Sequence, residues 1–214
     1  MILPDHGLYV ITDCRNLTTD ELITKTALIL QSGISMLQYR NKTANLPVRE
    51  YQALQLQQLC HNYSVPFIVN DDIKLAQKIN ADGVHLGRDD QACDNARKIL
   101  GPDYIIGISC YNKIKLALAA ETSGANYIAF GAFFPTTSKS VTSIATTALL
   151  TQAKQQLNLP VVAIGGITPE KGKKLVQAGA DFLAVISSIY EAPDPVMATR
   201  AYLNLFDDKQ KQYD

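Results

Sequence analysis

Short apolar segments alternate with longer segments of helical period along most of the chain. The apolar segments are rich in Val, Ile, Leu, Tyr and Phe, and their nearly continuous apolar character indicates strands that are buried on both faces. These segments span residues 8–12, 36–40, 67–70, 83–86, 105–110, 127–131, 161–165 and 182–187. A regular order of strand and then helix predicts a parallel sheet with right-handed crossovers.

The intervening segments predict amphipathic helices over residues 20–31, 48–60, 145–157, 169–178 and 195–205. In the second of these, Tyr51, Leu54 and Leu59 fall on one stripe, which we expect to face the sheet. Thr168 before Pro169 is typical of a helix start. Glycines follow three of the helical segments, where a left-handed C-terminal cap is expected: Gly33, Gly124 and Gly179.

Eight strand–helix units predict an α/β protein that closes into a single-domain (β/α)8 TIM barrel, and 214 residues suffice for one. We place the barrel domain at residues 1–206 and a polar C-terminal tail at 207–214. Six or seven units would instead form an open, doubly wound sheet. No G-x-G-x-x-G motif follows the first strand, which disfavours a dinucleotide-binding fold.

Composition narrows the classes of partner. Twenty basic and twenty acidic residues give a formal net charge of zero, so we expect no nucleic-acid binding. No window approaches the ~20 apolar residues that cross a bilayer, and the N-terminus does not resemble a signal peptide, which predicts a soluble cytoplasmic protein without membrane association. The four cysteines and three histidines are dispersed, which predicts reduced thiols and no histidine-based metal site. A homo-oligomer is left open.

The chemistry of a barrel of this type lies at the carboxyl ends of its strands. After the second strand, Gln38, Arg40 and Lys42 share one face if the chain stays extended. Two cations and an amide at the barrel mouth predict an anion-binding site. The alternative is a solvated strand end with a basic fringe.

Carboxylates follow the third and fourth strands. Asn70, Asp71 and Asp72 end one strand, and Asp89 and Asp90 follow the next. Because Mg²⁺ is held by one or two carboxylates together with substrate phosphates, we expect Asp71 and Asp90 to bind it. The alternative for each is a helix N-cap, a role that suits Asp72 and Asp89 better.

The remaining strand ends supply hydroxyls and glycines. Ser109 ends the fifth strand, and a loop over residues 131–139 carries hydroxyls and Lys139, as a lid over a polyanion would. Gly165 and Gly166 end the seventh strand, and Ser187 ends the eighth, where barrels often bind phosphate. His85 lies within the fourth strand, and we expect a core or supporting role for it rather than a catalytic one.

Six segments in this order resemble the thiamine-phosphate synthase family: residues 8–13, 38–42, 70–72, 82–87, 133–139 and 163–168. The match runs from about residue 7 to residue 195. The resemblance implies that hydroxymethylpyrimidine pyrophosphate joins hydroxyethylthiazole phosphate to give thiamine phosphate and pyrophosphate, through dissociative loss of the pyrophosphate. These two small molecules would be the partners, and Mg²⁺ the cofactor.

The resemblance also implies residue roles. Asp71 and Asp90 would carry Mg²⁺, and Lys139, Arg40 and Ser109 would act on the reacting groups. The pyrimidine diphosphate would be held by Gln38, Arg40, Lys42, Asn70, Ser109 and Lys139. Thr136 and Ser138 would contact the thiazole, and Gly166, Ile186 and Ser187 its phosphate.

Three rival functions share parts of this pattern. A thiazole tautomerase of the same fold needs no diphosphate clamp and uses a histidine near the position of Tyr111. A phosphate-binding isomerase of tryptophan biosynthesis would show a strand-end acid or thiol without a paired Mg²⁺ site. A catalytically inactive regulatory relative would bind thiamine phosphates and release no pyrophosphate. The retained cations and carboxylates favour the synthase.

Overall fold

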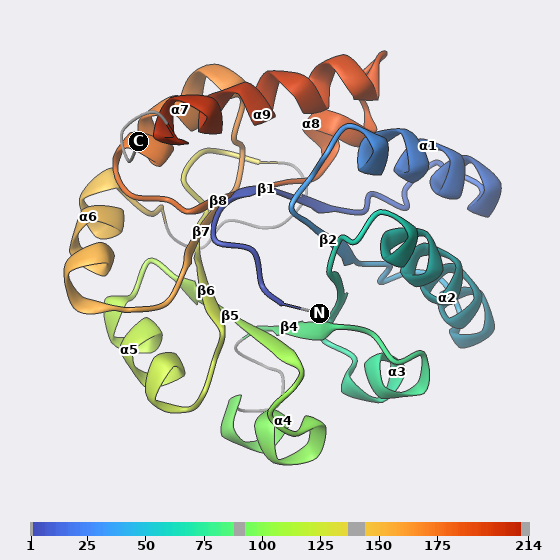
Figure 1. The fold of residues 1–214 in the computed structure, drawn as a ribbon, viewed down its shortest axis with the longest axis horizontal. Helices are drawn as coiled ribbons and strands as arrows, with labels where there is room; N and C mark the ends of the chain where they lie inside the picture. Colours follow the sequence, from blue (N-terminus) through green and yellow to red (C-terminus); the bar gives the residue numbers. More distant parts are fainter. Residues whose placement is uncertain (1, 88–92, 137–143, 211–214) are drawn as a thin grey trace.

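The computed structural model describes residues 2–87, 93–136 and 144–210 of the chain, which form a closed barrel ringed by helices (Figure 1). Each parallel strand pairs with the next, and β8 pairs with β1. The strands are β1 (Gly7–Ile11), β2 (Met36–Tyr39), β3 (Phe67–Asn70), β4 (Gly83–Leu86), β5 (Ile105–Tyr111), β6 (Tyr127–Phe130), β7 (Val161–Ile164) and β8 (Phe182–Val185). The predicted (β/α)8 TIM barrel is therefore confirmed, and the open sheet is excluded.

Helices follow the strands. They are α1 (Thr19–Gln31), α2 (Leu46–Asn62), α3 (Ile73–Lys78), α4 (Cys93–Leu100), α5 (Ile114–Thr122), α6 (Thr147–Gln156), α7 (Pro169–Gln177), α8 (Ser187–Tyr190) and α9 (Pro195–Gln210). Of these, α1, α2, α6, α7 and α9 match the five predicted helical segments. Thr168 caps α7 by accepting a hydrogen bond from the Lys171 backbone, as predicted. The three predicted glycine caps, Gly33, Gly124 and Gly179, have φ angles of 93°, 87° and 110°. The eighth strand is shorter than predicted because Ser187 already begins α8.

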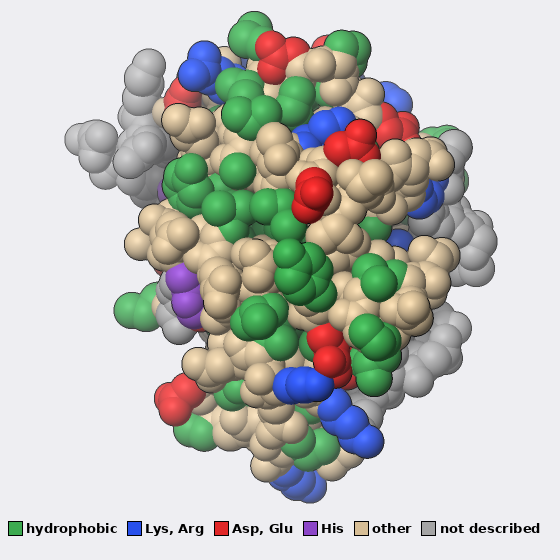
Figure 2. All heavy atoms as spheres, turned by 90° about the vertical axis from the view of Figure 1, so that its right-hand side faces the viewer, with side chains coloured by type: hydrophobic (Ala, Val, Ile, Leu, Met, Phe, Trp, Pro, Cys, Tyr) green, Lys and Arg blue, Asp and Glu red, His purple; other side chains and the backbone are tan. Residues whose placement is uncertain are grey.

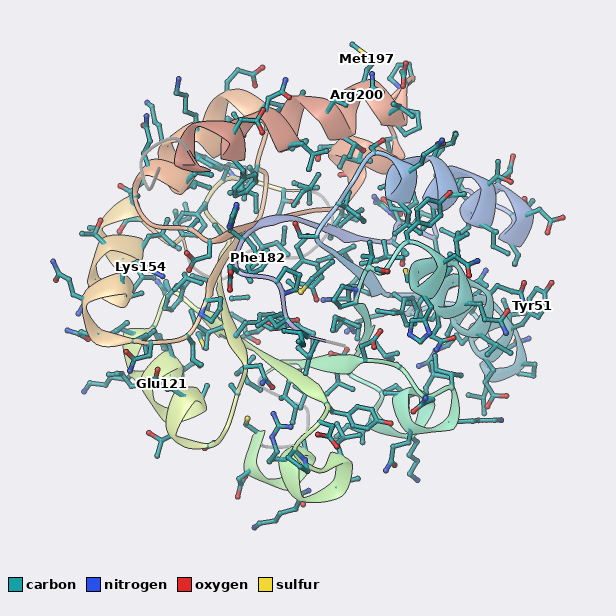
Figure 3. All side chains as sticks on the ribbon, in the orientation of Figure 1. Tyr51, Glu121, Lys154, Phe182, Met197 and Arg200 are labelled. Atoms are coloured by element: carbon teal, nitrogen blue, oxygen red, sulfur yellow. The ribbon has the colours of Figure 1, made fainter. Side chains whose placement is uncertain are left out.

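Apolar side chains form two layers. One fills the barrel interior and includes Tyr9, Met36, Tyr127 and Phe182. The other lies between the strands and the surrounding helices. Phe182, which is fully buried, lies within the ring of strands, whereas Met197 lies on the outside of α9 (Figure 3). Both faces of each strand are thus covered, which explains the continuous apolar runs in the sequence.

The predicted apolar stripe of α2 is wrong in its phase. Tyr51 and Leu54 are 54% and 39% exposed, and Figure 2 shows apolar side chains on the face of the molecule where α1 and α2 lie. The buried side of α2 instead includes Gln52, which accepts a hydrogen bond from the Tyr39 hydroxyl at 2.9 Å. A polar residue on the buried side hides the true phase of the helix from a pattern based on hydrophobicity.

No helix in the described part of the chain has the length and apolar character needed to cross a membrane.

Candidate active site

The charged side of the barrel mouth lies beyond β2 and β3. Lys42 Nζ forms an ion pair with Asp71 Oδ2 at 2.9 Å, and both side chains are partly exposed. Together with Asn70 and Arg49, these residues line a pocket of about 470 Å³. Asp71 has a φ of 63°, and its backbone N–H donates to the carbonyl of His85 on β4 at 2.9 Å. The Asp71 carboxylate is therefore presented from a fixed, left-handed turn.

Asp72, the next residue, has a different role. Its carboxylate accepts a hydrogen bond from the Leu75 backbone at 2.9 Å and so caps α3. It also pairs with Arg49 at 2.7 Å. The predicted N-cap at Asp72 is confirmed. Asp89 and Asp90 lie outside the described residues.

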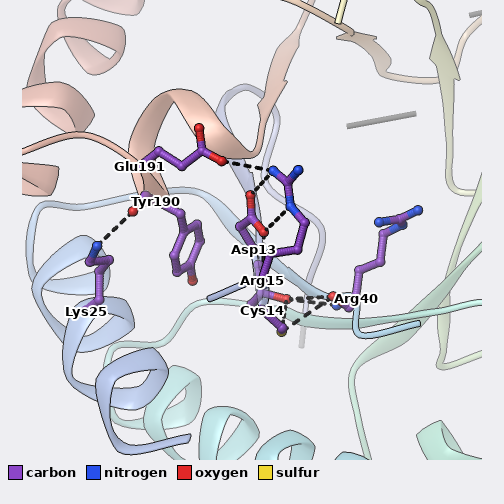
Figure 4. A network of polar contacts seen from close by, with 8 residues as sticks. Asp13, Cys14, Arg15, Lys25, Arg40, Tyr190 and Glu191 are labelled. Carbon is purple, nitrogen blue, oxygen red and sulfur yellow. Dashed lines mark hydrogen bonds and ion pairs between the residues drawn. The ribbon is translucent and has the colours of Figure 1, made fainter. Parts of the chain in front are cut away.

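Arg40 follows β2 directly, and its backbone is hydrogen-bonded to residues that follow β1. Its N–H donates to Thr12 Oγ1 at 2.9 Å, and the Cys14 thiol lies 3.6 Å from its carbonyl oxygen (Figure 4). The Arg40 guanidinium also lowers the pKa of Asp13 through its charge. These contacts fix the position of the Arg40 backbone at the barrel mouth.

An ion-pair network that the sequence analysis missed joins the loop after β1 to the end of α8. Asp13 is 5% exposed and pairs with Arg15 at 2.6 Å, and Arg15 also contacts Glu191 at 3.0 Å (Figure 4). Burial raises the pKa of Asp13, but the hydrogen bonds and charge of Arg15 outweigh it, so the pKa lies below its ordinary value. The sequence signal that could have predicted this ion pair is an Asp and an Arg two residues apart, directly after a barrel strand.

A set of hydrogen-bonded residues lies inside the barrel, and two of them, Tyr9 and Tyr127, were missed by the sequence analysis. Gln38 is only 2% exposed, and its amide donates to the Tyr9 hydroxyl at 2.7 Å. Tyr9 and Tyr127 join their hydroxyls at 2.8 Å. His85 Nδ1 lies 3.1 Å from the Tyr127 hydroxyl, and its Nε2 lies 2.9 Å from Ser109 Oγ. Gln38 and Ser109 are thus linked through two tyrosines that the sequence did not single out and through His85, for which a core or supporting role was expected.

The side of the mouth beyond β7 and β8 is built from backbone and small residues. Gly165 and Gly166 have φ angles of 105° and 62°. A Cβ on Gly166 would overlap the carbonyl oxygen of Pro135, and the Phe134 N–H donates to the Gly165 carbonyl at 3.0 Å. The two glycines therefore let the loop after β6 pack closely against the end of β7.

The other residues of this side are placed as follows. Ile186 precedes the first turn of α8, and Ser187 begins it. Thr136 is the last described residue before a gap in the loop after β6, and Ser138 and Lys139 lie outside the described residues. Since that loop packs against β7, its described part runs beside the glycine turn. The predicted phosphate-binding residues therefore share one side of the mouth.

Asp71 is suited to a hard cation, because its carboxylate is 30% exposed at the mouth. Among the described residues no three His, Cys, Asp or Glu side chains gather as a metal cluster. Mg²⁺ is usually held by one or two carboxylates together with oxygens of bound phosphates. The mouth as a whole offers cations and a carboxylate on one side, and glycine turns and hydroxyls on the other.

Comparison with known proteins identifies the family. Residues 8–189 match the family model described as thiamine monophosphate synthase. A thiamine-phosphate synthase of Nitrosococcus oceani is 48% identical over 201 residues, covering 94% of this chain and 93% of the relative. One from Xanthomonas campestris pv. campestris is 52% identical over 198 residues, covering 92% and 94%.

A solved structure agrees with these relatives. The thiamine phosphate pyrophosphorylase from Pyrococcus furiosus superposes with a TM-score of 0.86 at 33% identity, covering 95% of this chain and 96% of that one. Sequence, fold and coverage therefore point to one family over nearly the whole chain. The chain belongs to the thiamine monophosphate synthase family and is a transferase of thiamine biosynthesis.

Proposed function

We propose that this enzyme joins hydroxymethylpyrimidine pyrophosphate to hydroxyethylthiazole phosphate, giving thiamine phosphate and pyrophosphate, with Mg²⁺ as cofactor. The observation that carries this proposal is the meeting of Lys42 and Asp71 at 2.9 Å beside Asn70 at the barrel mouth. A cation beside a carboxylate suits a ligand that arrives as a metal-bound diphosphate. The free thiols of the chain accord with a cytoplasmic location, which we also propose.

The diphosphate would lie on the side of β2 and β3. Its oxygens would be held by Arg40, Lys42 and Asn70, with Gln38 and Ser109 reaching it from within the barrel and Lys139 from the loop after β6. Asp71 and Asp90 would hold Mg²⁺, which when bound neutralises charge on the leaving oxygens. Arg40, Ser109 and Lys139 would stabilise the charge that grows as the diphosphate leaves.

The thiazole phosphate would lie on the side of β7 and β8. Thr136 and Ser138 would contact the thiazole, and Gly166, Ile186 and Ser187 would bind its phosphate. The bond between the pyrimidine methylene and the diphosphate oxygen breaks first, and its electron pair leaves with the diphosphate. The thiazole nitrogen then supplies the pair for the new bond to the methylene carbon. The chain's part is to hold both reactants in line and to exclude water.

The direct test is to incubate the purified enzyme with both substrates and Mg²⁺ and to measure thiamine phosphate and pyrophosphate. We expect the two products in equal amounts, with loss of the reaction on chelation. Omission of the thiazole phosphate tests whether pyrophosphate release needs both reactants. Conversion of the carboxylated thiazole tautomer without any pyrimidine substrate would instead identify a tautomerase, and binding without pyrophosphate release a regulatory protein.

A further inference from the structure

A chain of hydrogen bonds crosses the barrel interior and joins five strands. It runs from Gln38 on β2 through Tyr9 on β1, Tyr127 on β6 and His85 on β4 to Ser109 on β5, with heavy-atom distances between 2.7 and 3.1 Å. Both ends belong to the residues proposed to bind the diphosphate. The three residues between them have no role in the proposed reaction so far. Both tyrosines are nearly or fully buried.

Packing holds the middle of this chain in one arrangement. The Tyr127 ring stacks on the His85 ring at 5.6 Å and meets the Tyr9 ring edge-on at 5.8 Å. Gly107 on β5 leaves the space that the Tyr127 ring fills, since a Cβ there would overlap the ring. Because the rings are fixed, the direction of the hydrogen-bond chain depends only on which atom donates in each bond.

The donor order can be worked out from the Gln38 end. The side-chain nitrogen of Gln38 can only donate, so the Tyr9 oxygen accepts from it. The Tyr9 proton then has Tyr127 as its acceptor. If Tyr127 donated instead, the Tyr9 oxygen would accept twice, and its buried proton would lack an acceptor among the described residues. Because buried donors are nearly always paired, Tyr9 donates to Tyr127.

The same reasoning fixes the rest of the chain. The Tyr127 proton goes to His85 Nδ1, so the neutral imidazole carries its proton on Nε2. That Nε2–H donates to Ser109 Oγ, and the Ser109 proton is left to point elsewhere than at His85. Burial raises the pKa of both Tyr9 and Tyr127 above the ordinary value, so both hydroxyls keep their protons at neutral pH.

We propose that the two buried tyrosines are positioning residues that set the tautomer of His85 and thereby turn the Ser109 proton toward the ligand at the barrel mouth. In the reaction proposed above, on which this inference rests for the identity of the ligand, that proton meets a diphosphate oxygen. A donor aimed there gains strength as charge grows on the leaving group, so it lowers the barrier more than it tightens binding.

The tautomer can be measured without any substrate by nitrogen-15 NMR of the histidine-labelled enzyme. The chain has three histidines, and the variants His6→Gln and His61→Gln assign the signals of the other two. We expect His85 to be neutral with its proton on Nε2. In Tyr127→Phe, Nδ1 loses its donor, and we expect a mixture of tautomers. Tyr190→Phe removes another buried hydroxyl, which bonds Thr26 away from the barrel interior, and should leave the signal unchanged.

Kinetics supply the second reading. Tyr127→Phe should lower kcat about 10-fold while KM for the diphosphate substrate changes less than about twofold, and Tyr9→Phe should have a smaller effect because His85 keeps its donor. Tyr190→Phe should keep wild-type kcat. A proton on Nδ1 in the wild type, or a Tyr127→Phe enzyme with an unchanged tautomer and kcat, would overturn the inference. Full activity of Ser109→Ala would instead count against the proposed role of Ser109, whatever the tautomer.

Discussion

The two sides of the barrel mouth differ in the groups that they present. Beyond β2 and β3 these groups are charged side chains, and Lys42 and Asp71 pair directly at 2.9 Å. Beyond β7 and β8 they are a glycine turn, at Gly165 and Gly166, and the first residue of a short helix, Ser187. The first side consists of charged side chains, and the second consists mainly of backbone that is held by the fold.

This difference fits two anions with different fates in the proposed reaction. A leaving diphosphate gains charge and moves away, and long cationic side chains can follow it. The phosphate of the thiazole stays unchanged throughout, and rigid backbone donors hold it without reorganising. We therefore expect variants on the first side to change kcat, and variants on the second side to change KM for the thiazole phosphate.

The largest effect is expected at Lys139, which the sequence places in the loop after β6. Lys139→Ala removes a mobile charge from the leaving group and should raise the barrier by roughly 2–4 kcal/mol, or ~30–1000-fold in kcat. Steady-state kinetics and thermal unfolding check this expectation. A normal kcat, or a variant that merely unfolds, would show that this loop does not act on the diphosphate.

The next largest effect comes from comparing two adjacent carboxylates. Asp71→Asn should lower Mg²⁺-dependent turnover roughly 100-fold, because the cation loses a charged ligand, with little change in stability. Asp72→Asn is the matched control, since Asp72 caps α3 and pairs with Arg49. Asparagine can still cap the helix, so the variant should lose only the ion pair with Arg49, at a cost of up to about 1 kcal/mol of unfolding free energy, and should leave turnover largely intact. Equal kinetic effects of the two variants, or full activity with excess chelator, would refute the assignment.

A smaller effect should separate the glycine turn from an ordinary helix cap. Gly166→Ala places a Cβ against Pro135 at a positive φ, and should raise KM for the thiazole phosphate about tenfold with kcat nearly unchanged. Gly33→Ala also places a Cβ at a positive φ, but no other group lies near that Cβ among the described residues. It should cost about 1 kcal/mol of stability and no affinity. An unchanged KM for the thiazole phosphate in Gly166→Ala would show that its phosphate does not bind at this turn.

The smallest effect concerns the ion pair that supports the loop after β1. The pKa of Asp13 lies below its ordinary value of 3.8 in the folded state. The pair with Arg15 therefore stabilises the fold fully at pH values above 3.8. This stabilisation is lost as the pH falls through the folded-state pKa. Asp13→Asn should lower the unfolding free energy by about 1 kcal/mol at pH 7 and by less near pH 3. Urea unfolding at both pH values measures this, and a pH-independent difference would contradict the pairing.

The fold was predictable because each strand is buried on both faces and its apolar run is therefore continuous. The N-cap at Asp72 was predictable because a cap directly precedes its helix. The phase of α2 could not be predicted, since Gln52 occupies its buried side. The hydrogen bonds of Tyr9 and Tyr127 were equally out of reach, because they join β1 to β6 across the barrel and depend on the register of strands far apart in the sequence.

The division of the mouth into two anion sites can be tested most directly by calorimetric binding of two probes to three proteins. The probes are Mg²⁺-pyrophosphate and hydroxyethylthiazole phosphate, and the proteins are the wild type, Asp71→Asn and Gly166→Ala. We expect Asp71→Asn to weaken only the binding of Mg²⁺-pyrophosphate, and Gly166→Ala to weaken only that of the thiazole phosphate. Loss of both ligands in either variant, or of the opposite ligand, would contradict the account.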